Sequence, residues 1–112
     1  MGTVIDTLPF LLVRARPKPG ARERFEPWFR QVHLRDAAAI PGIVRIRGGF
    51  TPTGTALGFY SFESNESVQT ALGSVEAAYA RGTWERWAPD LDELLIEIFA
   101  ALSPLPIYQS SS

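Results

Sequence analysis

The chain contains a single histidine, His33, and a carboxylate, Asp36, follows it three residues later. Residues three apart on an α-helix project from the same side, so these two side chains can meet. An imidazole has an ordinary pKa of about 6.5, which lets modest burial or a carboxylate partner set it near neutral pH. The spacing therefore predicts a general acid or base at His33 that Asp36 orients.

The same two residues also have a purely structural interpretation. His33 lies at the edge of the apolar stripe of its predicted helix, where it can simply close the groove between helix and sheet. Asp36 falls inside the apolar arc, where an unpaired carboxylate is costly. It should have a partner, either His33 or an arginine such as Arg45 or Arg47. In this interpretation Asp36 belongs to an ion pair without a chemical role.

Aromatic side chains are abundant, and several can form the walls of a pocket that binds a flat ligand by stacking and edge contacts. In a small domain each of them is equally an expected core residue. Two tyrosines are favoured because each would add a hydroxyl to the site. The predicted ligand-binding residues are Trp28, Phe29, Tyr60, Tyr79, Trp84 and Trp87.

Composition excludes several chemistries. The sequence has no cysteine, which excludes disulfides, thiolate nucleophiles and cysteine-ligated metals and fits a cytoplasmic protein. A single histidine cannot make a two-histidine metal site, and no phosphate-binding glycine loop or GxSxG motif occurs, so we expect neither a metal nor a cofactor. A net charge of −1 provides no basic surface for nucleic acid. No apolar run approaches the about 20 residues needed to cross a membrane.

Two helices are expected from apolar residues at intervals of three and four. The first covers residues 21–39, between the breakers of 17–20 and the Pro41-Gly42 turn. The second covers residues 66–81, with Gly82 as its left-handed cap and residues 83–89 as a short turn or helix that folds back over the core. Its predicted inner stripe is Val68, Leu72, Val75 and Tyr79.

Four strands are expected from runs that alternate with a period of two. In the second strand the alternation places Val44 and Ile46 on one face and Arg45 and Arg47 on the other. The predicted strands are residues 8–16, 43–50, 55–62 and 91–102.

The order β-α-β-β-α-β predicts an α+β, ferredoxin-like fold, in which a four-stranded antiparallel sheet carries two helices on one face. Residues 1–102 should form one domain, followed by a tail at 103–112. The open face of the sheet would then carry Arg45, Arg47, Glu97 and Phe99. A surface of mixed apolar and ionic character predicts a symmetric homodimer whose open sheet faces pack together.

Three segments, WFRQVHLRDAAAIPGIVRIRG, TALGFYSFES and AYARGTWERW, resemble the dimeric α+β-barrel superfamily, and most of all its EthD-like branch. The resemblance covers about residues 8–102. Phe29 stands where that branch often has a tyrosine, which removes a hydroxyl that would join His33 in proton transfer. The features that carry the resemblance are Trp28-Phe29, His33, Asp36, the Pro41-Gly42 turn and Arg45 or Arg47.

The resemblance implies a dimeric α+β barrel with a pocket between helices and sheet in each subunit. It also implies a cofactor-independent enzyme, of cyclase, isomerase, lyase or monooxygenase type, that acts on a small aromatic or polyketide-like compound with His33 as the proton-transfer residue. The alternative is a non-catalytic ligand-binding or stress-associated homodimer. An open groove beside His33 would favour the enzyme, and a groove filled by Trp84 or Trp87 would favour the alternative.

Overall fold

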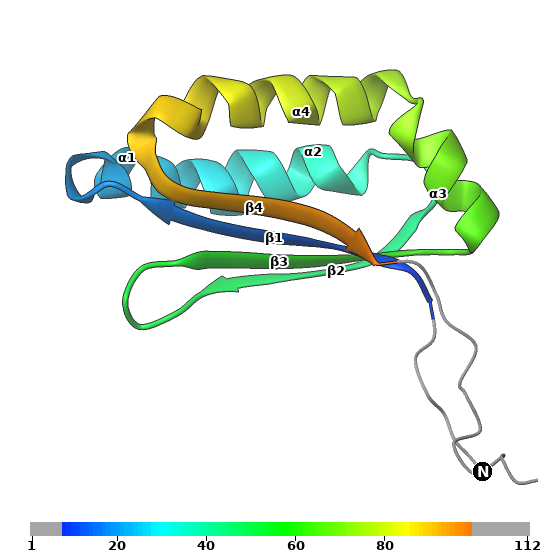
Figure 1. The fold of residues 1–112 in the computed structure, drawn as a ribbon, viewed down its shortest axis with the longest axis horizontal. Coiled ribbons are helices and arrows are strands. Elements are labelled where there is room, and N and C mark those ends of the chain that lie inside the picture. The colour runs from blue at the N-terminus through cyan, green and yellow to red at the C-terminus, as the bar shows by residue number, and fades with distance from the viewer. Residues whose placement is uncertain (1–7, 100–112) are drawn as a thin grey trace, which may run out of the picture.

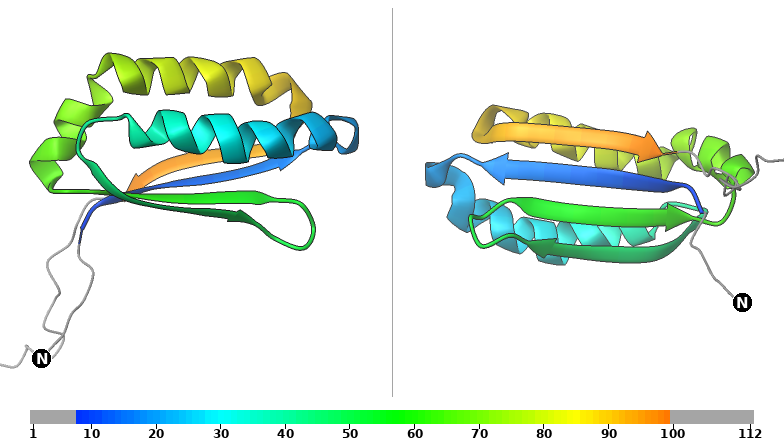
Figure 2. Two further views of the ribbon diagram at one scale, coloured as in Figure 1. Left: turned by 180° about the vertical axis from the view of Figure 1, so that it is seen from behind. Right: turned by 60° about the horizontal axis from the view of Figure 1, so that its bottom comes forward.

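The computed structural model describes residues 8–99, whose helical segments and strands follow the predicted β-α-β-β-α-β order (Figure 1). The strands form one sheet in the order β2-β3-β1-β4, and every neighbouring pair is antiparallel. All helical segments cover one face of the sheet and leave the other face open (Figure 2). The predicted ferredoxin-like α+β fold is confirmed. The strands are β1 (Phe10–Pro17), β2 (Ile43–Phe50), β3 (Ala56–Phe62) and β4 (Leu91–Phe99).

The predicted first helix is one helical segment with a widened turn in its middle. A short 3-10 turn, η1 (Pro19–Ala21), leads into α1 (Arg22–Pro27). A π-type turn, η2 (Trp28–His33), then joins α1 to α2 (Leu34–Ala38). The sequence predicted the segment but not the π-type turn, a feature that often occurs at functional sites.

The π-type turn determines which side chains face the sheet. The N–H of Leu34 donates to the carbonyl of Phe29, five residues earlier, instead of four as in an α-helix. Because a wider turn brings residues four apart more nearly into line, Phe25, Phe29 and His33 all lie buried between the helical layer and the sheet. The turn therefore positions the only histidine.

The predicted second helix, residues 66–81, is in fact two helices, α3 (Asn65–Leu72) and α4 (Val75–Trp87). They are separated at Gly73-Ser74, where the Ser74 hydroxyl accepts a hydrogen bond from the N–H of Ala77 and begins a new helix. Gly82 lies inside α4 and has no positive φ, so its prediction as a left-handed cap was wrong.

The new helix start also changes which residues face the core. Of the predicted stripe only Val68 is buried, whereas Leu72 is exposed, and Val75 and Tyr79 are 78% and 57% exposed. Because Ser74 caps a second helix, the apolar stripe of α3 does not continue into α4, and the prediction of one continuous inner face was wrong. The buried residues of α4 are Ala77, Ala80, Thr83 and Trp84.

The aromatic stretch predicted as a separate turn or helix at residues 83–89 completes α4. A 3-10 turn, η3 (Ala88–Asp90), then leads into β4. Trp84 is buried against Phe25, whose ring also contacts Trp28, Phe29, Phe50 and Trp87 at centroid distances of 5.1–6.5 Å. This aromatic cluster joins the helical layer to the sheet.

A register shift in β2 changes one predicted face. The shift lies between Ile43 and Arg45, and it lets Ile43 and Ile46 both pack against the core while Val44 is exposed. The prediction that Val44 shares the inner face was therefore wrong. In β4, Leu94 packs on the core and Ile96 and Ile98 lie toward the helices, so the alternate residues Glu97 and Phe99 lie on the open face as predicted. Residues 100–102 and the predicted tail at 103–112 lie outside the described residues.

Candidate functional site

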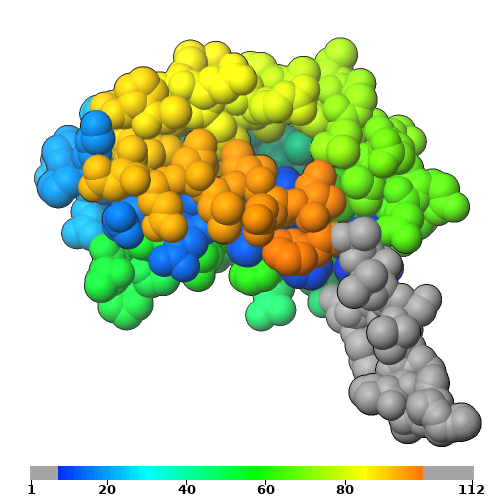
Figure 3. All heavy atoms as spheres, in the orientation of Figure 1, coloured from blue at the N-terminus to red at the C-terminus, as the bar shows by residue number. Residues whose placement is uncertain are grey.

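A cavity of about 380 Å³ lies between the helices and the sheet. In Figure 3 the surface is hollowed between α4 and β4, so the cavity opens on this side of the molecule. The helices α2, α3 and α4 face the cavity with small alanine side chains, which leave the space open. Aliphatic side chains of the sheet form the opposite wall. These residues are Ala37, Ala71, Ala77 and Ala80 on the helices, and Leu11, Val13, Ile96 and Ile98 on the sheet.

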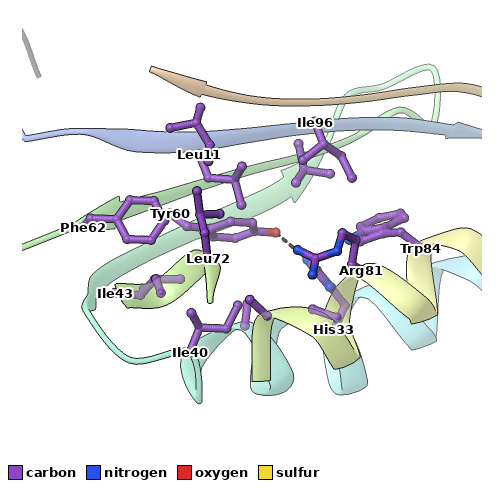
Figure 4. A pocket seen from close by; sticks show the side chains of 16 residues that line it. Leu11, His33, Ile40, Ile43, Tyr60, Phe62, Leu72, Arg81, Trp84 and Ile96 are labelled. Carbon is purple, nitrogen blue, oxygen red and sulfur yellow. Dashed lines mark hydrogen bonds between the residues drawn. The ribbon is translucent and has the colours of Figure 1, made fainter. Parts of the chain in front are cut away.

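His33 and Tyr60 meet inside this cavity. His33 Nε2 and Tyr60 Oη share a hydrogen bond of 2.7 Å, which joins the end of η2 to the middle of β3 (Figure 4). The two side chains are only 3% and 1% exposed. The sequence singled out both residues, but it did not pair them. Their contact spans the two layers and 27 positions of the chain.

Gly58 creates the room that Tyr60 needs. Alternation along β3 places residues 58 and 60 on the same face of the sheet, and the ring of Tyr60 lies over Gly58. A Cβ atom at position 58 would collide with the Tyr60 hydroxyl and the adjoining ring atoms. Sequence reasoning missed this role, although a glycine two residues before an inward tyrosine is a readable signal.

Aromatic rings surround the imidazole and remove it from water. The ring of Trp84 meets His33 edge-on at 4.8 Å, and the rings of Phe29 and Trp28 lie at 5.2 and 5.3 Å. This burial lowers the pKa of His33 from 6.5 to about 4 and raises the pKa of Tyr60 above the ordinary phenol value. At neutral pH the pair is therefore an uncharged imidazole and a protonated phenol.

The tautomer of His33 decides which group is presented to a ligand. His33 Nδ1 is buried without a hydrogen-bond partner among the described residues. With the ring proton on Nε2, His33 donates to Tyr60 and the phenol hydrogen is free to bond to a ligand oxygen. With the proton on Nδ1, Tyr60 donates to Nε2 and the phenol oxygen remains an acceptor. Depending on the tautomer of His33, the Tyr60 hydroxyl can thus donate a hydrogen bond to a ligand in the cavity or accept one from it.

Asp36 does not contact His33. Its Oδ1 lies 3.4 Å from Arg35 Nη2, and its Oδ2 is buried without a partner among the described residues. Asp36 borders a separate hollow with Val75 and Tyr79 of α4, whereas His33 points to the sheet. Asp36 therefore pairs with Arg35, its neighbour in the chain. It does not pair with His33 or with the arginines of β2, which were the expected partners.

The predicted aromatic residues fall into three groups. Trp84 borders the cavity together with Tyr60. Trp28 and Phe29 pack around His33 without bordering the cavity, and Trp28 also borders a second hollow of about 300 Å³ with Trp87. Tyr79 is exposed and borders the hollow beside Asp36 instead of the cavity.

Arg81 is a cavity residue that the sequence analysis missed. Its side chain reaches from α4 to the side of the cavity where His33 and Tyr60 meet (Figure 4). The signal that could have found it is its place one residue after Ala80 and three before Trp84, both of which border the cavity. Finding it required the correct phase of α4.

Two other features concern the part of the chain that the structure describes. Within residues 8–99 no three His, Asp or Glu side chains gather closely enough to hold a metal ion. None of the helices in that range combines the length and the apolar character needed to cross a membrane.

No protein-family model matches this sequence, and no curated protein is significantly similar to it. Solved structures do match. An EthD family protein from Bacillus halodurans C-125 has a TM-score of 0.67 at 18% identity, over 85% of this chain and 100% of that chain. A protein of unknown function from Nitrosomonas europaea has a TM-score of 0.64 at 22% identity, over 86% and 90%. An antibiotic biosynthesis monooxygenase has a TM-score of 0.62 at 8% identity, over 86% and 100%.

These matches confirm the predicted ferredoxin-like α+β fold, which this chain shares with an EthD family protein and an antibiotic biosynthesis monooxygenase. At such low identities the shared feature is the fold, and a fold carries many different activities. The functional argument therefore depends on the cavity and its residues.

Proposed function

We propose that this chain is a small-molecule enzyme without a metal or an organic cofactor, of cyclase, isomerase, lyase or monooxygenase type. Its substrate is a small aromatic or polyketide-like compound that enters the cavity between helices and sheet. The observation that carries the proposal is the bond between a neutral imidazole, His33, and a phenol, Tyr60, on the wall of an open apolar cavity. Trp84 forms part of that wall and leaves the cavity unfilled, which favours the enzyme over a non-catalytic binding protein.

Proton transfer through this pair follows from the geometry. A proton from the substrate passes to Tyr60 Oη while the phenol proton moves along the 2.7 Å bond to His33 Nε2. The step forms a substrate anion and an imidazolium close together. Their attraction offsets the desolvation that otherwise lowers the pKa of His33. Return of the proton to a different substrate atom completes an isomerisation, and the anion can otherwise cyclise or eliminate.

We expect wild type to convert at least one compound of a panel of small aromatic, polyketide-like and lactone compounds. His33→Gln and Tyr60→Phe should each lower kcat by about 10²-fold or more, because each removes one partner of the proton path. Turnover is followed by chromatography, and folding of each variant by circular dichroism. Tyr79→Phe is the matched control, since it removes an exposed hydroxyl outside this cavity and should leave kcat unchanged.

The alternative makes the opposite prediction. If wild type binds panel compounds but converts none, or if His33→Gln lowers only the melting temperature and leaves turnover intact, His33 is structural. The chain would then be a non-catalytic ligand-binding or stress-associated homodimer. A cytoplasmic location and the absence of a nucleic-acid partner stay predictions from the sequence.

We further propose that the chain forms a homodimer through the open sheet face. An apolar cluster lies toward one end of this face, where Phe10 contacts Phe59 and Phe99 at ring distances of 5.9 and 4.8 Å. Phe59 and Phe99 are still 43% and 41% exposed, and large exposed apolar patches are typical of interfaces. Arg45 and Arg47 lie on the edge strand β2, and Glu97 lies on the opposite edge strand β4.

This charge arrangement selects one symmetry. A twofold axis parallel to the strands places the β2 edge of one sheet over the β4 edge of the other, so arginines face glutamates. A twofold axis across the strands places like edges together, so arginines would face arginines. Arg45, Arg47 and Glu97 form no ion pair among the described residues, which leaves them available to a second copy.

We expect wild type to sediment as a dimer in analytical ultracentrifugation. Glu97→Arg should weaken dimerisation about tenfold or more, because it sets like charges against each other across the interface. Adding Arg47→Glu should restore the dimer by exchanging the two signs. Glu85→Arg, on the exposed side of α4, is the control and should have no effect. A monomeric wild type, or a double variant weaker than Glu97→Arg alone, would contradict the proposed interface.

A further inference from the structure

Arg81 is the one charged side chain among the described residues that border the cavity between helices and sheet. The ion pairs of the described residues join Arg14 and Arg16 to Glu93, Arg24 to Asp90 and Arg35 to Asp36, and none includes Arg81. No hydrogen bond within the described part of the chain satisfies its guanidinium either. The side chain therefore presents a full positive charge and five N–H donors at the mouth of an apolar space.

The position of Arg81 relates its charge to the proposed chemistry. Figure 4 shows the guanidinium on the same side of the cavity as the hydrogen bond between His33 and Tyr60, while Ile40 and Phe62 lie farther from it. A ligand whose polar end reaches Arg81 thus extends into the cavity that His33 and Tyr60 also border. The remaining aliphatic walls can accept only an apolar body.

We propose that the substrate is an amphipathic carboxylate, which binds its carboxylate group to Arg81 at the cavity mouth and its aromatic or aliphatic body inside. Guanidinium and carboxylate form paired, charge-assisted hydrogen bonds in a fixed geometry, so Arg81 sets the orientation of the ligand. The body of the ligand then lies in the cavity that the proton-transfer pair borders. This inference rests on the proposed function for its chemistry, but the binding mode can be tested without turnover.

The probes are 2-naphthoate and its methyl ester, which share one ring system and differ in charge. We expect isothermal titration calorimetry of wild type to show that the carboxylate binds about tenfold tighter than the ester. Arg81→Gln should remove this preference by weakening only the carboxylate. Added salt should weaken the binding of the carboxylate and leave that of the ester unchanged, because only the carboxylate forms an ion pair.

Arg86→Gln is the matched control, because Arg86 lies on the same helix but borders the separate hollow beside Trp28 and Trp87. It should leave both affinities unchanged. Equal affinities for acid and ester, an unchanged preference in Arg81→Gln, or saturable binding of neither probe would each overturn the inference. Carboxylate binding that depends on Arg81, combined with no turnover of any panel compound, would support this inference and count against the proposed enzyme.

Discussion

Lowering the pH from 7 to 4 is expected to reduce the free energy of unfolding of wild type by about 3 kcal/mol more than that of His33→Gln. The pKa of His33 is about 4 in the folded protein because burial disfavours the imidazolium, and it returns to 6.5 on unfolding. Between these two values the unfolded chain binds more protons than the folded one. Stability therefore falls as the pH decreases from about 6.5, and this loss levels off only below pH 4, where the folded protein also binds the proton.

Urea titrations at a series of pH values would measure the effect. His33 is the only histidine, so His33→Gln removes the imidazole contribution and leaves the carboxylates unchanged. The difference between the two proteins isolates that contribution, even if the variant is less stable at every pH. Parallel curves would show that His33 titrates equally in both states. The lowering of the His33 pKa by burial would then be absent.

Gly58→Ala is expected to lower the free energy of unfolding by about 2 to 4 kcal/mol. The new Cβ would occupy space that the Tyr60 hydroxyl now fills, so the phenol must move and its hydrogen bond to His33 is lost. Overpacking a core position costs about 1 to 3 kcal/mol, and a lost buried hydrogen bond adds about 1 kcal/mol. Gly49→Ala is the matched control on β2, because no atom lies within 4 Å of a Cβ added there.

A double-mutant cycle tests the cause of this loss. Once Tyr60→Ala has removed the phenol, adding Gly58→Ala should cost less than about 1 kcal/mol, because Tyr60 supplies the nearest atoms that a new Cβ meets. The free energies would be measured by urea denaturation of all four proteins. Additive losses would mean that Gly58 is needed for the backbone of β3 rather than for the position of Tyr60.

The local pattern of the sequence was sufficient to predict where most helices and strands lie. It was insufficient to predict which residues of each element face the core. Strands β1, β3 and β4 and the segment from α1 to α2 follow the periodicity of their apolar residues closely. The errors in assigning buried faces arose where a new helix start or a register shift interrupts the periodic pattern. Ser74 starts a new helix, and this turned Val75 and Tyr79 outward and brought Arg81 to the cavity. The register shift before Arg45 had the same kind of effect on Val44.

The candidate site shows the same division. His33, Tyr60 and Trp84 were selected by residue type, because a lone imidazole and polar aromatics are natural components of a ligand site. The supposed partner of His33 was Asp36, because spacing along a helix was the only distance that the sequence provided. The π-type turn directs His33 to the sheet, and there Tyr60 lies within hydrogen-bond distance.

By itself, the sequence determined the order of elements, the ferredoxin-like fold and the open sheet face, because these follow from spacings of two to four residues along the chain. The tertiary structure alone decided that His33 pairs with Tyr60, that Gly58 makes room for the phenol and that Arg81 borders the cavity. The physical reason is that such contacts join different layers. Their geometry depends on how close two elements pack and in which phase each one begins, and local periodicity carries neither quantity.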